Sequence, residues 1–285
     1  MFRLVSFNVN GIRAAERRGF RTWLAERTPD VLAIQEMRCP EPDVPDVFGD
    51  YHLTYHCGTL PGRNGVALAT TVEPSRVRHG FGSREFDTEG RYVEADVDLP
   101  GGARLRVASV YVPKGGTPYE DAASLVKMER KLRFLRSFAR HLTQTRREAA
   151  REGREFVVMG DWNIAPTALD LKNWRTNRRS EGFLPEERDW IASVQSPRTL
   201  VDVVRHHVGE QDGPYSWWSW RGKAFDNDSG WRIDYQLATP TLARAAVAAG
   251  TDRDASYDDR ISDHAPVVVD YRWSAPAPDP TSEEN

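Results

Sequence analysis

Residues 156–163 are Phe-Val-Val-Met-Gly-Asp-Trp-Asn, four apolar residues that run into a glycine and then into an acid and an amide two positions apart. The apolar run is short, contains two β-branched residues and ends in a break, so it predicts a buried β-strand. Because side chains alternate along a strand, Asp161 and Asn163 would leave its end in the same direction. A carboxylate beside an amide suits chemistry at a phosphate, and an Asx turn that closes the strand is the alternative interpretation.

The composition predicts one large domain. The chain has 285 residues, 39% of them hydrophobic, and no Pro/Gly/Ser-rich linker divides its middle. We therefore expect a single domain over residues 1–273 and a disordered Pro-rich, acidic tail over residues 274–285. The formal net charge of −3 gives no global support for nucleic-acid binding, so any such surface must be local.

Cysteine content and hydropathy indicate the compartment. Cys39 and Cys57 are the only cysteines, too few for a disulfide framework or a metal cluster, so we expect reduced thiols in a cytoplasmic protein. The N-terminal residues lack the apolar region of a signal peptide, and no stretch is long and apolar enough to span a membrane. The sequence thus predicts no membrane association.

The hydrophobic pattern predicts many short strands and few helices. Strands are expected at residues 4–10, 31–36, 51–56, 65–71, 91–99, 105–111, 231–238 and 265–271, and helices at 13–27, 120–151 and 185–194. Residues 91–99 alternate cleanly, which predicts a strand with one face in water. This mixture favours two packed sheets flanked by helices, with an open α/β sheet as the alternative.

Polar residues lie at or near the ends of six of these strands. They are Asn8 with Asn10, Glu36, Tyr111, Asp161 with Asn163, Asp234, and Asp263 with His264. If these residues meet on one rim, they form a cleft of four carboxylates, three amides, a phenol and an imidazole. Such a set of oxygen ligands without cysteine suits a hard cation such as Mg²⁺.

Eight motifs give the chain a resemblance to a known family. They are FNVNGIR (7–13), IQE (34–36), YVP (111–113), GDWNIAP (160–166), GFLPEER (182–188), YSWWSWR (215–221), WRID (231–234) and SDHAP (262–266). Together, in order along almost the whole chain, they resemble exodeoxyribonuclease III, the bacterial abasic-site endonuclease branch of the endonuclease/exonuclease/phosphatase superfamily. The resemblance implies a DNase I-like four-layer α/β sandwich, in which helices flank two packed mixed β-sheets, and Mg²⁺-dependent phosphodiester hydrolysis, with Mn²⁺ as an alternative metal.

The resemblance also implies roles for the acids. Glu36 would be the main metal ligand, with Asn10 nearby and Asp263 as a second, weaker metal contact. Asp161 would orient and deprotonate the attacking water. The metal and the hydrogen-bond donors would stabilise the charge of the pentavalent phosphorus.

The remaining polar residues would serve the phosphate. Asn163 and Asn8 would hold phosphate oxygens or neighbouring catalytic groups, and Tyr111 would contact the phosphate or the leaving oxygen. Asp234 would pair with His264, so that a charged imidazole faces the phosphate.

The resemblance further implies DNA as the substrate. Trp217, Trp218 and Trp231 match the family's pocket for the base-free sugar of a flipped abasic nucleotide, although an aromatic run can also be core. A basic strip for phosphates would consist of Arg91, Lys114, Arg175, Arg178, Arg179, Arg221 and Lys223. Within it, residues 175–179 are the best candidate for a loop beside the duplex. The expected partner is double-stranded DNA, especially abasic or nicked, bound by a monomer.

Three residues depart from the family pattern. Trp162 stands where a smaller apolar residue is usual, Lys114 replaces a polar amide after Tyr-x-Pro, and Trp231 replaces an aliphatic residue. We expect these changes to alter pocket size, and so the balance between cleavage 5′ to abasic sites and removal of nucleotides or blocking groups from 3′ ends in base excision repair. The alternatives are a phosphatase or phosphodiesterase for small phosphate esters or lipids, and a catalytically weak DNA-binding relative.

Overall fold

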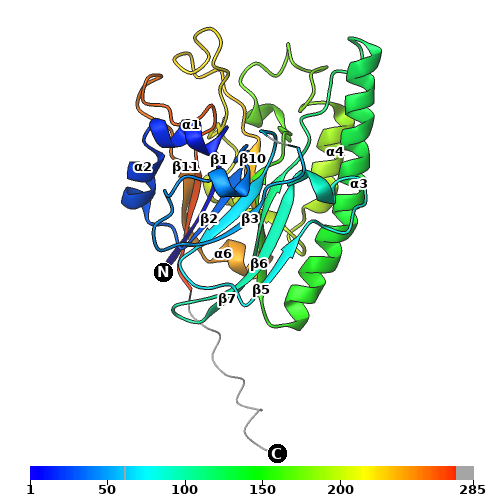
Figure 1. The fold of residues 1–285 in the computed structure, drawn as a ribbon. Helices are drawn as coiled ribbons and strands as arrows, with labels where there is room; N and C mark the ends of the chain where they lie inside the picture. Colours follow the sequence, from blue (N-terminus) through cyan, green and yellow to red (C-terminus); the bar gives the residue numbers. More distant parts are fainter. Residues whose placement is uncertain (61, 274–285) are drawn as a thin grey trace, which may run out of the picture.

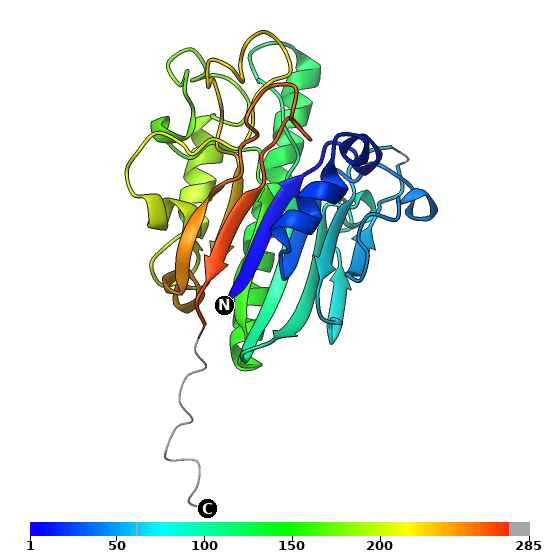
Figure 2. The ribbon, with the colours of Figure 1, turned by 90° about the vertical axis from the view of Figure 1, so that its left-hand side faces the viewer.

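Two six-stranded β-sheets form the centre of the computed structural model, which describes residues 1–60 and 62–273 (Figures 1 and 2). The first has the order β11-β12-β1-β2-β4-β3, with β1 Phe2–Asn8, β2 Val31–Gln35, β3 His52–His56, β4 Val66–Thr70, β11 Ala246–Thr251 and β12 Val267–Tyr271. The second has the order β5-β6-β7-β8-β10-β9, with β5 Arg76–His79, β6 Tyr92–Leu99, β7 Ala103–Tyr111, β8 Glu155–Asp161, β9 Val201–Asp202 and β10 Asp234–Ala238. The tail expected over residues 274–285 lies outside the described residues.

Four helices cover the outer faces of the sheets: α1 Ile12–Arg17 and α2 Phe20–Arg27 on the first, and α3 Ala122–Arg151 and α4 Pro185–Val194 on the second. The short helices α5 Val203–Val208 and α6 Pro240–Arg244 contribute residues to the core between the sheets. One apolar core contains residues of both sheets, such as Leu4 and Val107; a second joins α3 to the second sheet, and a third joins α1 and α2 to the first. The four-layer prediction is confirmed, and an open α/β sheet is excluded.

The stretch at residues 156–163 forms the centre of the second sheet. Val157 and Met159 face the core between the sheets, whereas Phe156 and Val158 face α3. Gly160 has no room for a side chain, because a Cβ there would lie 1.9 Å from the Val110 carbonyl oxygen. This close approach fixes the register of β7, β8 and β10. The register sets Asp161 opposite both Tyr111 and Asp234.

The helix expected over residues 13–27 is two helices. Helix α1 ends at Arg17 and α2 begins at Phe20. Between them Gly19 adopts a φ of 100°, in the left-handed region that favours glycine. The glycine therefore lets the chain turn while Phe20, Trp23 and Leu24 still reach the core.

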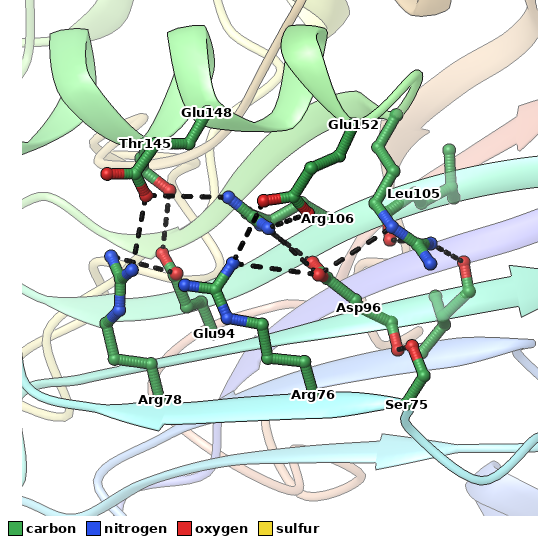
Figure 3. A network of polar contacts seen from close by, with 12 residues as sticks. Ser75, Arg76, Arg78, Glu94, Asp96, Leu105, Arg106, Thr145, Glu148 and Glu152 are labelled. Atoms are coloured by element: carbon green, nitrogen blue, oxygen red, sulfur yellow. Dashed lines mark hydrogen bonds and ion pairs between the residues drawn. The ribbon is translucent and has the colours of Figure 1, made fainter.

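The expectation of a wet face on residues 91–99 is wrong. Helix α3 covers that face, and Glu94 and Asp96 are only 2% and 3% exposed (Figure 3). Both acids have partners there: Arg106 donates from Nε and Nη2 to Asp96 at 2.7 and 2.9 Å, and Arg78 pairs with Glu94. Strand alternation reports which residues share a face, but here paired charges occupy a buried one.

Removing Arg106 should unfold the protein more easily. The Arg106→Met variant keeps an unbranched apolar stem but leaves Asp96 buried without its bidentate partner, so the free energy of unfolding should fall by about 3–5 kcal/mol. Urea denaturation at neutral pH measures this change. Arg104→Met is the control on the same strand, because Arg104 and its partner Asp98 are both exposed and their ion pair should contribute little. Equal unfolding midpoints for the two variants would contradict a stabilising role for the buried pair.

Two further expectations concern the cysteines and the membrane. Cys39 and Cys57 are free thiols, as expected. Within residues 1–60 and 62–273, no helix combines the length and the apolar character needed to cross a membrane.

Candidate active site

The polar strand ends meet in one pocket. It has a volume of about 360 Å³ and is lined by residues that include Glu36, Tyr111, Asp161, Asn163, Asp263 and His264. Asn8, Asn10 and Asp234 do not line it but contact residues that do. The structure thus brings together all the strand-end residues picked out in the sequence.

Asn8 joins the two carboxylates of the pocket floor. The side chain is fully buried, and its Nδ2 donates to Glu36 Oε1 and to Asp161 Oδ2, each at 2.9 Å. Its Oδ1 accepts from the backbone N–H of Asn10 at 3.0 Å. Asn8 therefore holds the Glu36 and Asp161 carboxylates next to each other, an arrangement that suits the second of the two roles that the resemblance offered.

Three residues with a left-handed backbone conformation turn the chain at the rim of the pocket. Asn10, Glu36 and Asn163 have φ values of 48°, 56° and 52°, which are uncommon outside glycine and asparagine. Each follows a strand, so the turn aims its side chain back across the strand ends. Asn163 shows the result: its Nδ2 donates to the Val112 carbonyl at 2.9 Å and to Asp161 Oδ2 at 3.2 Å.

Asp234, His264 and Asp161 form a charged row. His264 Nδ1 lies 2.9 Å from Asp234 Oδ2, and His264 Nε2 lies 3.8 Å from Asp161 Oδ2. Burial alone would lower the pKa of His264, but the Asp234 and Asp161 carboxylates raise it to about 10. Burial and the charge of Asp234 raise the pKa of Asp161 to about 8. The imidazole is therefore a cation, and Asp161 binds a proton more tightly than an ordinary aspartate does, so it acts as a base only in its deprotonated form.

Tyr111 lies beside these acids as a neutral donor. Burial raises the pKa of its phenol well above the ordinary value, and the charges of Glu36 and Asp161 raise it further. The guanidinium of Arg91 lies 5.1 Å from the ring centre and donates to the Tyr111 carbonyl. The phenol thus keeps its proton and can donate it to an oxygen in the pocket.

The acidic residues fit a divalent cation. Glu36, Asp161 and His264 are a group of described residues whose ligand atoms lie within 4.8 Å of one another. Since His264 is protonated, the two carboxylates are the available ligands. Glu36 Oε2 is buried and accepts no hydrogen bond, although it forms an ion pair with Arg38. Carboxylate oxygens held this close together are the ligands that a hard cation prefers.

Asp263 has a different set of contacts. Its Oδ1 accepts from Asn10 Nδ2 at 2.7 Å and from Ser262 Oγ at 3.3 Å, and its Oδ2 accepts from Trp217 Nε1 at 3.1 Å. It is not part of the acidic group around Glu36. Its contacts orient the Trp217 indole and the Asn10 amide.

Sequence reasoning missed two residues of the site. Arg38 lines the pocket and pairs with Glu36; its place two residues after the acid was the available signal. Ser216 is fully buried, donates to Asp234 Oδ2 at 2.6 Å and accepts from the Ile233 and Asp234 N–H groups. Ser216 lies in the YSWWSWR motif, but the motif gives no sign of its partners, Ile233 and Asp234, which lie just before and at the start of β10.

The tryptophans divide into pocket and core. Trp217 and Trp231 line the pocket with their rings 6.3 Å apart. Trp218 is only 1% exposed, donates to Asp228 and packs against Phe225, so the expectation that it lines the pocket is wrong. Neighbouring residues in this extended segment point to opposite sides, and only one of the pair can face the pocket.

The expected basic strip is partly present. Lys114 lines the pocket, and the loop with Arg175, Arg178 and Arg179 continues into pocket residues at positions 177 and 180–182. Arg221 and Lys223 are exposed but do not line the pocket. Arg91 is a correction: it is 8% exposed and bonded to Glu89, so it supports Tyr111 instead of offering a free surface charge.

Two of the three family departures line the pocket. Lys114 and Trp231 do so, and Lys114 Nζ lies 3.6 Å from Glu181. Trp162 points away from it: the ring is fully buried and packs against Phe138 and Trp190. The expectation that Trp162 alters pocket size is therefore wrong, because its side chain belongs to the α3–α4 layer.

Comparison with known proteins agrees with this geometry. The model of the Endonuclease/Exonuclease/phosphatase family matches residues 5–264. Exodeoxyribonuclease III of Haemophilus influenzae is 31% identical over 281 residues, covering 95% of this chain and 100% of the relative. An AP endonuclease from Archaeoglobus fulgidus superposes with a TM-score of 0.78 at 30% identity, over 95% of this chain and 99% of that one.

A third relative was solved with DNA. The 3′ phosphatase NExo from Neisseria, bound to a product DNA hairpin, superposes with a TM-score of 0.80 at 25% identity, over 96% of this chain and all of that one. Sequence and fold agree over nearly the full length of each relative. The chain therefore belongs to the endonuclease/exonuclease/phosphatase family, among the relatives of exodeoxyribonuclease III.

Proposed function

We propose that this protein is a metal-dependent DNA-repair phosphodiesterase that cuts the backbone 5′ to abasic sites and trims 3′ ends. The observation that carries the proposal is the joint geometry of Asp161, Glu36 and His264: a base, a cation ligand and a fixed positive charge around one cavity. Each of these three groups suits one role in phosphodiester hydrolysis: activating water, binding the cation or stabilising the charge on the phosphate. Residues 1–273 would form a single catalytic domain.

The chain's own residues account for the proton transfers. Asp161 would take a proton from water as the water oxygen bonds to phosphorus. The bond from phosphorus to the 3′ oxygen of the preceding nucleotide then breaks, and Tyr111 is placed to protonate that oxygen. The His264 cation would donate to a non-bridging oxygen, and the Asn163 amide, whose N–H groups go to Val112 and Asp161, would orient Asp161. Glu36 would hold Mg²⁺ or Mn²⁺, with Asn10 nearby and Asp263 as a second, weaker contact, and the metal would neutralise phosphate charge when bound.

The proposed partner is double-stranded DNA with an abasic site or a nick, bound by a monomer in the cytoplasm. Trp217, Trp231 and Ile233 give the pocket an apolar wall, which suits a sugar without its base. Lys114 and the loop at residues 175–179 would contact the phosphates of the duplex. The two free cysteines suit a reducing compartment.

A direct comparison of substrates tests this proposal against small-ester hydrolysis. The protein would be given a duplex with one tetrahydrofuran abasic analogue, the matched intact duplex, and p-nitrophenyl phosphate, each with Mg²⁺. We expect rapid cleavage of the abasic duplex, slower release of nucleotides from its 3′ ends and little turnover of the ester. Preferred turnover of the ester would favour the phosphatase alternative.

Trp217 should govern the preference for abasic sites. Loss of its ring in Trp217→Ala removes one pocket wall, so the ratio of kcat/KM on abasic and intact duplex should fall about tenfold, which corresponds to about 1.4 kcal/mol of apolar contact with the sugar. Steady-state cleavage of both duplexes measures the ratio. Trp190→Phe is the control, because Trp190 packs against Trp162 behind the sheet. An unchanged ratio in Trp217→Ala would remove this residue from the pocket assignment.

A further inference from the structure

Behind the pocket wall lies a buried arginine without a carboxylate partner. Arg260 is 2% exposed, and within the described residues no carboxylate oxygen lies within 4.0 Å of its nitrogen atoms. Aromatic faces surround it instead: its guanidinium carbon lies 4.1 Å from the ring centre of Trp220, 4.7 Å from that of Phe225 and 5.7 Å from that of Tyr257. Burying a charge is costly unless hydrogen bonds and aromatic contacts replace the lost contacts with water.

Those hydrogen bonds reach two backbone carbonyls at the pocket. Arg260 Nη2 donates to the Trp218 carbonyl at 2.7 Å and to the Asp263 carbonyl at 2.9 Å. The Asp263 carbonyl also accepts from the Trp218 N–H at 3.0 Å. One guanidinium nitrogen therefore clamps the segment after Trp217 to the turn before His264.

Both clamped segments carry pocket side chains. Trp217 pairs through its backbone with His264 on one side and with Trp231 on the other. Its indole Nε1 donates to the Asp263 carboxylate at 3.1 Å, and the same carboxylate accepts from Asn10. A shift of the Asp263 backbone would move the acceptor that orients the Trp217 ring.

We propose that Arg260 is the positioning residue that sets the apolar wall of the pocket, by fixing Trp217 and Asp263 relative to each other. It does not line the pocket and would not touch the substrate. The inference rests on the proposed function, because the wall is assigned there to the abasic sugar. Its effect should fall on recognition of the abasic site, since Asp161 and Asn163 are held by other contacts.

Arg18 provides a matched control. It is exposed, and its guanidinium carbon lies 4.7 Å from the ring centre of the same Trp220. Arg18 thus has the same kind of stacking contact as Arg260 but, within the described residues, no side-chain hydrogen bond to the pocket segments. Comparing Arg260→Met with Arg18→Met separates the two carbonyl bonds from the loss of a stacked cation.

The test measures binding as well as turnover. Fluorescence anisotropy in EDTA gives the Kd for a tetrahydrofuran duplex and for the matched intact duplex, and cleavage in Mg²⁺ gives KM and kcat. For Arg260→Met we expect abasic binding to weaken about tenfold, with a matching rise in KM and a smaller change in kcat, because a displaced wall misplaces the sugar. Arg18→Met should behave as wild type.

Three results would overturn the proposal. One is an Arg260→Met enzyme with wild-type preference for the abasic duplex. Another is a loss confined to kcat with Kd and KM unchanged, which a purely structural role would give by reducing the amount of folded enzyme. If Arg260→Met does not fold, Arg260→Lys decides: it keeps the cation, but its ammonium ends short of the position of Nη2, so abasic binding should weaken several-fold, and wild-type values would contradict the clamp. A wild-type protein without abasic preference would refute the proposed function instead.

Discussion

The Asp161→Asn variant should lose about 10³-fold in kcat on an abasic duplex at saturating Mg²⁺, because the amide cannot accept the proton of the attacking water. The side chain keeps its size. Removing a buried carboxylate whose pKa is raised to about 8 relieves a cost of folding, so the variant should remain folded. Single-turnover cleavage measures the chemical step, and thermal unfolding measures the fold.

A second acid serves as the control for Asp161. Asp202 is also buried, and it accepts from Arg232 Nη1 at 2.7 Å, away from the pocket. Asp202→Asn should lower the unfolding temperature and leave kcat almost unchanged. If Asp161→Asn kept kcat within about tenfold of wild type, the base would have to be another group.

The second large effect concerns the cation. Glu36→Gln should reduce cleavage about 100-fold at millimolar Mg²⁺, since a neutral amide binds a hard cation weakly. Higher Mg²⁺ should recover part of the activity, because the lost step is binding. A Mg²⁺ titration of the cleavage rate measures this shift, and calorimetric titration of Mg²⁺ checks it without turnover.

Glu181→Gln is the matched control for Glu36. Glu181 also lines the pocket, but it pairs with Lys114 and Thr117 at the opposite wall. Its substitution should leave the Mg²⁺ dependence unchanged. A Glu36→Gln protein with wild-type Mg²⁺ dependence would remove Glu36 from the cation site.

The sequence predicted the polar residues of the pocket well because strand ends are local features. An apolar run that ends in Asp161 or Glu36 places the acid at the end of a strand, whatever the rest of the chain does. The resemblance then led us to expect that these strand ends meet in one pocket. The structure adds the reason, which is the register that sets Tyr111 and Asp234 opposite Asp161.

The errors came from side chains whose neighbours in the fold the hydrophobic pattern does not identify. Trp218 and Trp162 are core residues because they pack against Phe225 and Phe138. Arg91 is withdrawn from the surface by Glu89, and the acids of β6 are buried because α3 packs over them. Alternation gives the two faces of an element, but only the tertiary partners decide which face meets water.

Arg260 shows the same limit of sequence analysis, here for a residue that the sequence did not single out. An arginine two residues before Ser262 gives no sign in the sequence that three aromatic rings enclose it. Its contacts depend on the fold, which brings together the loops that hold Trp220 and Tyr257. Support for a site is harder to predict than the site itself, because it is built from side chains with no common motif.

The central claim is best tested by mapping the cut in a duplex that carries one tetrahydrofuran abasic analogue and a label on the lesion strand, with Mg²⁺ and with EDTA. We predict one Mg²⁺-dependent cut immediately 5′ to the analogue, which leaves a 3′ hydroxyl, and no cut in EDTA. Cleavage that persists in EDTA, or cleavage without regard to the position of the analogue, would contradict the account.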